Sequence, residues 1–218
     1  MTATLVFLAL LMGAVVWWLV RQTINVKPWV ASAPSGAQQG VGLVAPQKMA
    51  LGVLLAVITS LFALFISAYS IRMELSDWRP LPEPDLLWLN TAILFVGSLG
   101  LQWAWRGAAR QQWPAIRVGL VVGGGCALAF MAGQLLVWQD LAASGYLIAS
   151  NPANAFFYVL TGLHVLHLLG GLVVLARTSG HAWSGALAKA RLGVELCAVY
   201  WHFLFVVWLI LFGLMLST

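Results

Sequence analysis

The chain has 218 residues, of which 62% are apolar and only 8% are charged. A soluble domain carries about a quarter charged residues, so this chain cannot cover a water-facing surface, and its surplus apolar side chains must face lipid. The formal net charge of +5 gives no reason to expect a nucleic-acid partner, because basic groups between apolar runs suit anionic lipid head groups. Composition therefore predicts an integral membrane protein.

The apolar residues fall into long runs, each sufficient to cross a hydrocarbon core of roughly 30 Å. Such runs are typical of helices, which satisfy their own backbone groups in lipid, and are too uniformly apolar for the alternating strands of a membrane barrel. The first run lacks a basic segment before it, and Arg21 follows it, so we interpret it as a true span and not a secretory signal. We predict an all-α membrane protein with six transmembrane helices, at about residues 3–20, 49–71, 86–105, 115–137, 153–176 and 192–216.

Basic residues are distributed unevenly between the connections. Nine of the eleven lie in alternate connections, and only Arg72 and Arg79 lie on the other side, together with most of the acidic residues. Because short basic loops stay in the cytoplasm, both termini are expected in the periplasm of a bacterial inner membrane. The nine are Arg21, Lys27, Lys48, Arg106, Arg110, Arg117, Arg177, Lys189 and Arg191.

Three polar or glycine-rich segments indicate how the spans are organised. The connection before Lys48 contains a Ser-, Gly- and Gln-rich stretch over residues 31–40, typical of a flexible linker. We therefore divide the chain into residues 1–47, an extra N-terminal helix with a cytoplasmic linker, and residues 48–218, a helical bundle. The three prolines of residues 79–84 predict a stiff segment that lies over the bundle or against a neighbour. Gly119 and Gly123 share one helix face, so another helix can approach closely there.

A few polar side chains within the spans are costly in lipid and therefore need a reason. Thr161, His164 and His167 form one stripe of the fifth span, and Glu195 and His202 share a face of the sixth, about 10 Å apart along the axis. Three interpretations compete: a hydrogen-bonded clamp between the two helices, a metal site of two histidines with Glu195, or haem ligation. His164 and His167 lie too close on one helix to hold opposite faces of one iron. We favour the clamp, with Glu195 paired to a histidine, and expect no catalytic residue, metal or cofactor site on this chain.

The same helices resemble a known family. Phe156-Phe-Tyr158 with Thr161-Gly-x-His164-x-x-His167 is similar to the penultimate helix of subunit III of haem-copper oxidases, the cytochrome c and quinol oxidases. Gly193-Val-Glu195, Tyr200-Trp-His-Phe203 and Val206-Val-Trp208 resemble that family's last helix, and Lys48 and Tyr69 keep the family's separation in an earlier one. Further positions in earlier helices also match the family. Taken together, the motif residues are Asn90, Thr91, Gln134, Trp138, Tyr200, Trp201, Phe203 and Trp208.

The resemblance implies a non-catalytic subunit with a five-helix common bundle, which agrees with the last five predicted spans. It implies packing against subunit I as the main partner, association with subunit II, binding of phospholipid, and haem and copper held on partner chains. The sequence departs from the family where membrane carboxylates are usual, at Ile58, Val137 and just after Phe203. Because carboxylates are the groups able to relay protons, this puts a proton-uptake role in doubt and leaves the scaffold role untouched.

Two other functions compete with this interpretation. One keeps the fold and changes the complex, as an accessory protein of a nitric oxide reductase. The other is a small-solute or proton transporter, which needs a buried charge relay or broken helices. Glu195 is the only acidic residue inside a predicted span, so the transporter ranks below the other two.

Overall fold

A computed structural model describes residues 17, 46–82 and 85–217 of the chain, and its ordered segments there are helical. Five of the helices are each long and apolar enough to cross a membrane. The chain is therefore a multi-pass membrane protein, and the predicted all-α class and the last five predicted spans are confirmed. The first predicted span falls outside the described residues, apart from Trp17. The five helices are α2 (Pro46–Arg72), α3 (Leu86–Ala109), α4 (Trp113–Ala143), α5 (Pro152–Trp183) and α6 (Leu187–Leu216).

Several helices are longer than the apolar runs that predicted them. α4 has 31 residues and α5 has 32, or about 47 Å at 1.5 Å per residue, against a hydrocarbon core of roughly 30 Å. The additional turns include charged and polar residues such as Arg177 and Asp140. Hydropathy marks where the lipid begins, whereas the helix continues into the head-group region until a capping residue ends it.

The chain divides into two compact units, residues 1–67 and 68–218. The first includes most of α2, and the second contains α3 to α6 complete. The predicted division after residue 47, which assigns an extra helix and a linker to residues 1–47, stays a prediction.

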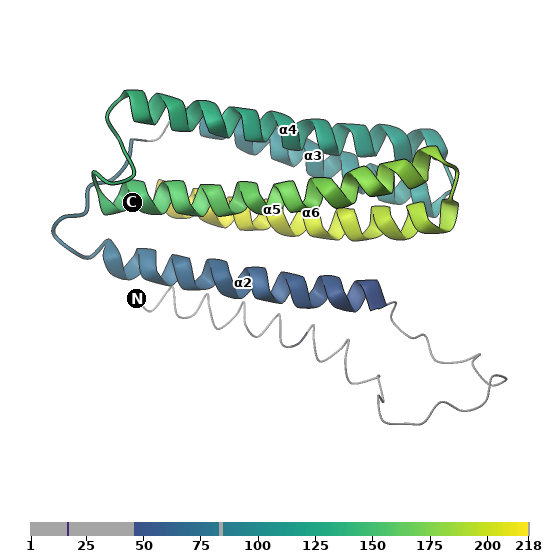
Figure 1. The fold of residues 1–218 in the computed structure, drawn as a ribbon, viewed down its shortest axis with the longest axis horizontal. Coiled ribbons are helices and arrows are strands. Elements are labelled where there is room, and N and C mark those ends of the chain that lie inside the picture. The colour runs from purple at the N-terminus through teal and green to yellow at the C-terminus, as the bar shows by residue number, and fades with distance from the viewer. Residues whose placement is uncertain (1–16, 18–45, 83–84, 218) are drawn as a thin grey trace. The chain divides into compact units, whose positions relative to one another are not determined.

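The second unit is a four-helix bundle. α3 packs against α4 and α6, and α5 packs against the same two helices, so the order around the bundle is α3, α4, α5, α6. Consecutive helices run in opposite directions (Figure 1). The short α3–α4 and α5–α6 connections consequently share one end, and the α4–α5 connection lies at the other.

The closest approach in this bundle is between α3 and α4. A Cβ atom added to Gly119 would lie 2.4 Å from the backbone oxygen of Gly100, and one added to Gly123 would lie 2.6 Å from the Leu101 side chain. The prediction that Gly119 and Gly123 admit a close neighbour is confirmed, and the neighbour is α3. Small residues let helix backbones approach in lipid, where van der Waals packing drives association.

Local signals in the sequence fix the ends of α4 and α5. Gly145 and Gly185 follow the last turns of the two helices with φ of 87° and 77°, a conformation that glycine adopts without strain. The amide of Tyr146 then bonds back to the Leu141 carbonyl at 2.9 Å. At the start of α5, the Asn151 side chain accepts from the Ala153 amide at 3.1 Å and caps the helix.

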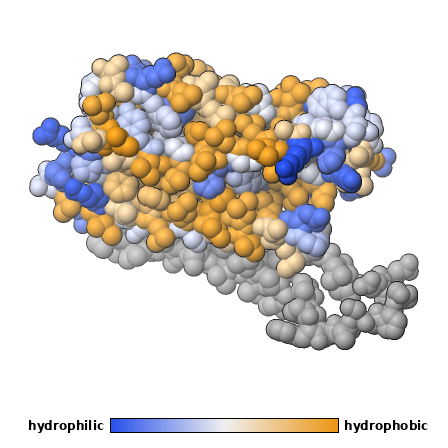
Figure 2. Space-filling model, viewed as in Figure 1, coloured by the Kyte–Doolittle hydropathy of each residue, from blue (hydrophilic) through white to orange (hydrophobic). Residues whose placement is uncertain are grey.

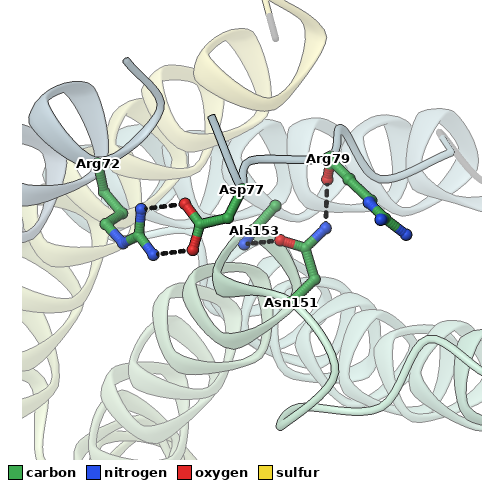
Figure 3. A network of polar contacts seen from close by, with 5 residues as sticks. All are labelled: Arg72, Asp77, Arg79, Asn151 and Ala153. Carbon is green, nitrogen blue, oxygen red and sulfur yellow. Dashed lines mark hydrogen bonds and ion pairs between the residues drawn. The ribbon is translucent and has the colours of Figure 1, made fainter. Parts of the chain in front are cut away.

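The proline-containing segment after α2 lies against the start of α5, as Figure 3 shows. Arg72 forms a two-bond ion pair with Asp77, one of its bonds 2.6 Å long. The Asn151 side chain donates to the Arg79 carbonyl at 2.8 Å. Of the two predicted placements of this segment, the structure shows the one over the bundle, for its described residues up to 82.

Charged residues divide between the two ends of the second unit. Figure 2 shows apolar side chains over the middle of the visible face and hydrophilic ones toward its ends. We call the end with the α3–α4 and α5–α6 connections the basic end, because Arg106, Arg110, Arg117, Arg177, Lys189 and Arg191 lie on or beside them. The acidic end is the opposite one, with Glu74, Asp77, Asp85 and Asp140.

Candidate functional site

The polar side chains singled out in the sequence lie in the second unit, and two Trp–Thr pairs tie its helices together. The Trp138 indole of α4 donates to the Thr161 hydroxyl of α5 at 3.1 Å, and that hydroxyl donates to the Phe157 carbonyl at 2.6 Å. The same arrangement joins α6 to α3: Trp208 donates to Thr91 at 2.9 Å, and Thr91 donates to the carbonyl four residues earlier. In each pair the threonine serves its own helix and accepts from a neighbouring one, so no hydroxyl group is left unpaired in lipid.

His164 occupies the centre of the bundle and is fully buried. Its ring lies with its centroid 5.7 Å from that of Phe130 on α4 and 5.3 Å from that of Trp208 on α6. Neither ring nitrogen has a hydrogen-bond partner in the described protein. An imidazole held between two aromatic rings, with no carboxylate bonded to it, packs as a neutral aromatic group.

His167 and Tyr200 connect α5 with α6. The His167 ring nitrogen Nδ1 bonds to the Leu163 carbonyl at 2.6 Å, and the Tyr200 hydroxyl donates to the His167 carbonyl at 2.9 Å. Gly171 makes room for this contact, since a Cβ there would lie 2.8 Å from the rings of Tyr200 and Trp201. The side chain and the backbone carbonyl of His167 therefore both form hydrogen bonds, and α6 packs directly on this turn of α5.

His202 contacts α3. Its Nδ1 lies 2.9 Å from the Ser98 hydroxyl, and its Nε2 lies 2.9 Å from the Gln102 side-chain oxygen. Both ring nitrogens are satisfied by these two residues. His202 therefore belongs to the contact of α6 with α3. Thr161 and His164, by contrast, join α5 to α4, and His164 also contacts α6.

Glu195 lies on α6 seven residues before His202 and is partly buried. Its pairing with a histidine of α5, the core of the predicted clamp, stays a prediction.

Among the family-motif residues, Phe203 is partly buried, whereas Asn90, Gln134, Trp201 and Trp208 are buried in the bundle. Among residues 46–82 and 85–217, no group of three or more His, Cys, Asp or Glu side chains is placed to hold a metal ion.

The basic end has one residue that ties two helices together. The Arg117 guanidinium of α4 donates to the Ala182 carbonyl near the end of α5 at 3.4 and 3.5 Å. It also lies 5.8 Å from the ring centroid of Trp183 and 6.0 Å from that of Trp113. A cation among tryptophans at a helix end is typical of a membrane interface.

Comparison with known proteins places this bundle in a family. The model of the family described as cytochrome c oxidase subunit III matches residues 3–217. The chain belongs to the cytochrome c oxidase subunit III family. Its relatives include a probable cytochrome c oxidase subunit 3 of Mycobacterium tuberculosis, 31% identical over 159 residues, or 70% of this chain and 76% of the relative. The cytochrome c oxidase subunit 3 of Synechocystis is 31% identical over 186 residues (77% and 74%), and that of Petromyzon marinus is 25% identical over 225 residues (96% and 80%).

Two contacts of this subunit III are formed by residues that sequence analysis missed. Ser98 and Gln102 of α3 bond to His202, and their spacing of four residues places them on one helix face. Two polar residues four apart within one predicted span could have indicated a polar contact with a neighbouring helix. Val137 and Leu204, two positions at which the sequence analysis noted a departure from the resemblance, are almost completely buried apolar side chains.

Proposed function

We propose that the chain is the non-catalytic third subunit of a proton-pumping haem-copper terminal oxidase of the cytochrome c oxidase type. The observation that carries this is the family match over residues 3–217. Members of this family do not themselves hold the redox centres and associate with other oxidase subunits. Haem and copper would accordingly be bound by the partner chains, and electrons would reach oxygen without passing through this one.

The contacts within the second unit support a scaffold role. Trp138, Trp208, Tyr200 and His202 each bond to a helix of the bundle other than their own. Burying a polar group in lipid is energetically unfavourable, and in this bundle such groups form bonds that hold neighbouring helices in register. Together with Glu195, they would maintain a rigid surface on which the catalytic subunit packs.

The proposed partners are subunit I, as the main contact, and subunit II, with phospholipid at the helix surfaces. The proposed location is the bacterial inner membrane with both termini in the periplasm. The separation of a basic from an acidic end supports this orientation, because basic connections stay in the cytoplasm. The basic end also offers Arg117 and its neighbouring tryptophans to anionic lipid head groups.

The nitric oxide reductase accessory protein is not favoured, because the relatives are named as subunits of cytochrome c oxidase. A transporter is supported by none of the observations above. We therefore retain the oxidase assignment alone.

The test is to purify the chain from its natural host membrane through an affinity tag, in mild detergent. We expect a haem-copper subunit I to co-purify, with a haem spectrum and with oxygen uptake at an electrode when a reduced donor is supplied. Co-purification with a chain that reduces nitric oxide and not oxygen would replace this function with the accessory one. Recovery without any haem-containing chain would reject both.

A further inference from the structure

Three fully buried polar residues at the centre of the bundle are left over from the contacts described above. Asn90 on α3, Gln134 on α4 and His164 on α5 have no solvent exposure. Both polar atoms of each side chain, six in all, lack a hydrogen-bond partner in the described protein. Buried polar groups are nearly always paired, with protein or with ordered water, so three such residues in one bundle require an explanation. We call Asn90, Gln134 and His164 the polar layer.

The contacts around them place these residues at one level of the bundle. Phe130 and Trp138 lie one turn before and one turn after Gln134, and they contact His164 and Thr161 of α5 respectively. Gln134 therefore lies at the same level of the bundle as the turn of α5 from Thr161 to His164. Asn90 lies against Gly133, the residue before Gln134, where a Cβ atom would fall 2.1 Å from the Asn90 side-chain oxygen.

The side chains of Asn90 and His164 are held in place by their surroundings. Asn90 abuts the α4 backbone at Gly133, so its amide has little freedom to swing toward another partner. The His164 ring lies beside the rings of Phe130 and Trp208, which themselves pack at 4.7 Å with an interplanar angle of 85°. Since Asn90 and His164 are confined in this way, a bound small molecule is a direct way to satisfy the polar atoms of the layer.

The chemistry of the groups selects the molecule. Each amide offers two donors and an acceptor oxygen, and neutral imidazole offers one donor and one acceptor. The layer has no carboxylate or ammonium group, so it suits neither an ion nor a charged ligand. Water can donate and accept at once, and a buried water needs two to four polar partners. We propose that the polar layer is an internal water-binding site, in which at least one ordered water bridges Gln134 to Asn90 or His164.

Such a site would join α4 to α3 or to α5 through a shared ligand. α3 and α4 meet at their glycine contacts, and α5 reaches α4 through Trp138 and Thr161, so bridging water would strengthen one of these pairwise contacts at the bundle centre. The inference concerns this chain's own interior and does not depend on which electron acceptor the complex uses.

The test is a cryo-electron microscopy map of the intact purified complex, at a resolution that shows other buried waters. We expect density about 2.7–3.2 Å from polar atoms of at least two layer residues. A map that resolves other buried waters but has no density here, or that shows the three side chains bonded directly to one another, would overturn the proposal.

A pair of variants sharpens this result. Gln134→Met preserves length and removes the hydrogen-bonding groups, so the bridging density should disappear. Gln102→Met makes the same change on α3, at a side chain that bonds to His202 outside the layer, and should leave the layer density unchanged. Density that persists unchanged in Gln134→Met would overturn the proposal, because the bridging water is assigned to Gln134. If Gln134→Met does not assemble, the map of the unmodified complex still decides the question.

Discussion

The Thr91 hydroxyl links α3 with α6 beside the bonds of His202 to Ser98 and Gln102, and it is a direct probe of how this bundle is held together. Thr91→Val preserves the shape and removes the acceptor of the Trp208 indole, 2.9 Å away. A buried donor without a partner costs about 1–3 kcal/mol, so we expect the complex to unfold at a lower temperature or to lose this subunit more readily in detergent. Ser60→Ala is the control, because Ser60 bonds only within its own helix at an exposed position, and it should change stability by less than about 0.5 kcal/mol. Equal effects of the two substitutions would contradict the proposed link.

Glu195 distinguishes a structural clamp from a proton relay. If it is a clamp member, Glu195→Gln should retain much of the hydrogen bonding and be tolerated, whereas Glu195→Leu should leave a donor unpaired at a cost of roughly 1–3 kcal/mol. The Leu variant should then weaken retention of the subunit with nearly normal initial turnover. An amide cannot carry a proton, so a relay predicts that even the Gln variant loses initial rate. Initial oxygen uptake and subunit retention, measured on both variants, decide: an immediate loss of rate in Glu195→Gln with full retention would reject the clamp.

At the scale of elements, the contact of α3 with α4 depends on the absence of side chains. In Gly119→Ala, the new Cβ would lie 2.4 Å from the Gly100 carbonyl oxygen, so the two backbones must separate. Overpacking of this kind costs about 1–3 kcal/mol. Gly125→Ala, on the same helix, meets nothing within 4 Å and should be neutral or slightly stabilising, since alanine favours helix over glycine by about 1 kcal/mol. Thermal unfolding of the two variants should therefore shift in opposite directions or by clearly different amounts. Similar losses would mean that the close approach does not limit stability.

The segment that follows α2 is fastened by a charge pair that titrates. Hydrogen bonds from Arg72 lower the pKa of Asp77 below its ordinary value. A group with a lowered pKa in the folded state contributes stability above its unfolded pKa of about 3.9, and this contribution is lost as the pH falls through the folded pKa. We expect residues 73–82 to become more susceptible to an acid-active protease below about pH 4, and Asp77→Asn to be susceptible already at neutral pH. Because the Asp77 side chain is 58% exposed and the Arg72 side chain 29% exposed, the effect should be confined to the segment, and a matching loss of global stability would contradict this explanation.

The elements were predictable to the extent that hydropathy and glycine positions report on them. The last five spans, and the close approach at Gly119 and Gly123, follow from apolar runs and from small residues on one face. The extra turns of α4 and α5 do not, because helix ends are set by caps such as Asn151 and Gly185 and not by lipid thickness.

The site was less predictable than the elements. The spacing of Thr161, His164 and His167 places them on one face of α5, but no spacing within a helix says which neighbour that face meets. The assignment of His202 to Ser98 and Gln102 depends on the rotation of α3 relative to α6. The burial of Asn90 and Gln134 depends in the same way on the complete ring of four helices.

At the scale of the whole molecule, orientation in the membrane follows from the asymmetry between the basic and the acidic end. Six basic residues lie on or beside the α3–α4 and α5–α6 connections, while Glu74, Asp77, Asp85 and Asp140 lie at the opposite end, where α6 terminates. Because basic connections stay on the cytoplasmic side, the basic end should face the cytoplasm and the end of α6 the periplasm.

A reporter that functions only in the cytoplasm measures this directly. Fused after Thr218 it should be inactive, because α6 ends at the acidic end of the bundle. Inserted after Ser184, in the α5–α6 connection between Trp183 and Leu187, it should be active, and this second fusion controls for expression and folding of the reporter. Activity after Thr218 together with inactivity after Ser184 would reverse the proposed orientation. Activity at both positions would contradict the assignment of α6 as a membrane span, since one span between two sites must place them on opposite sides.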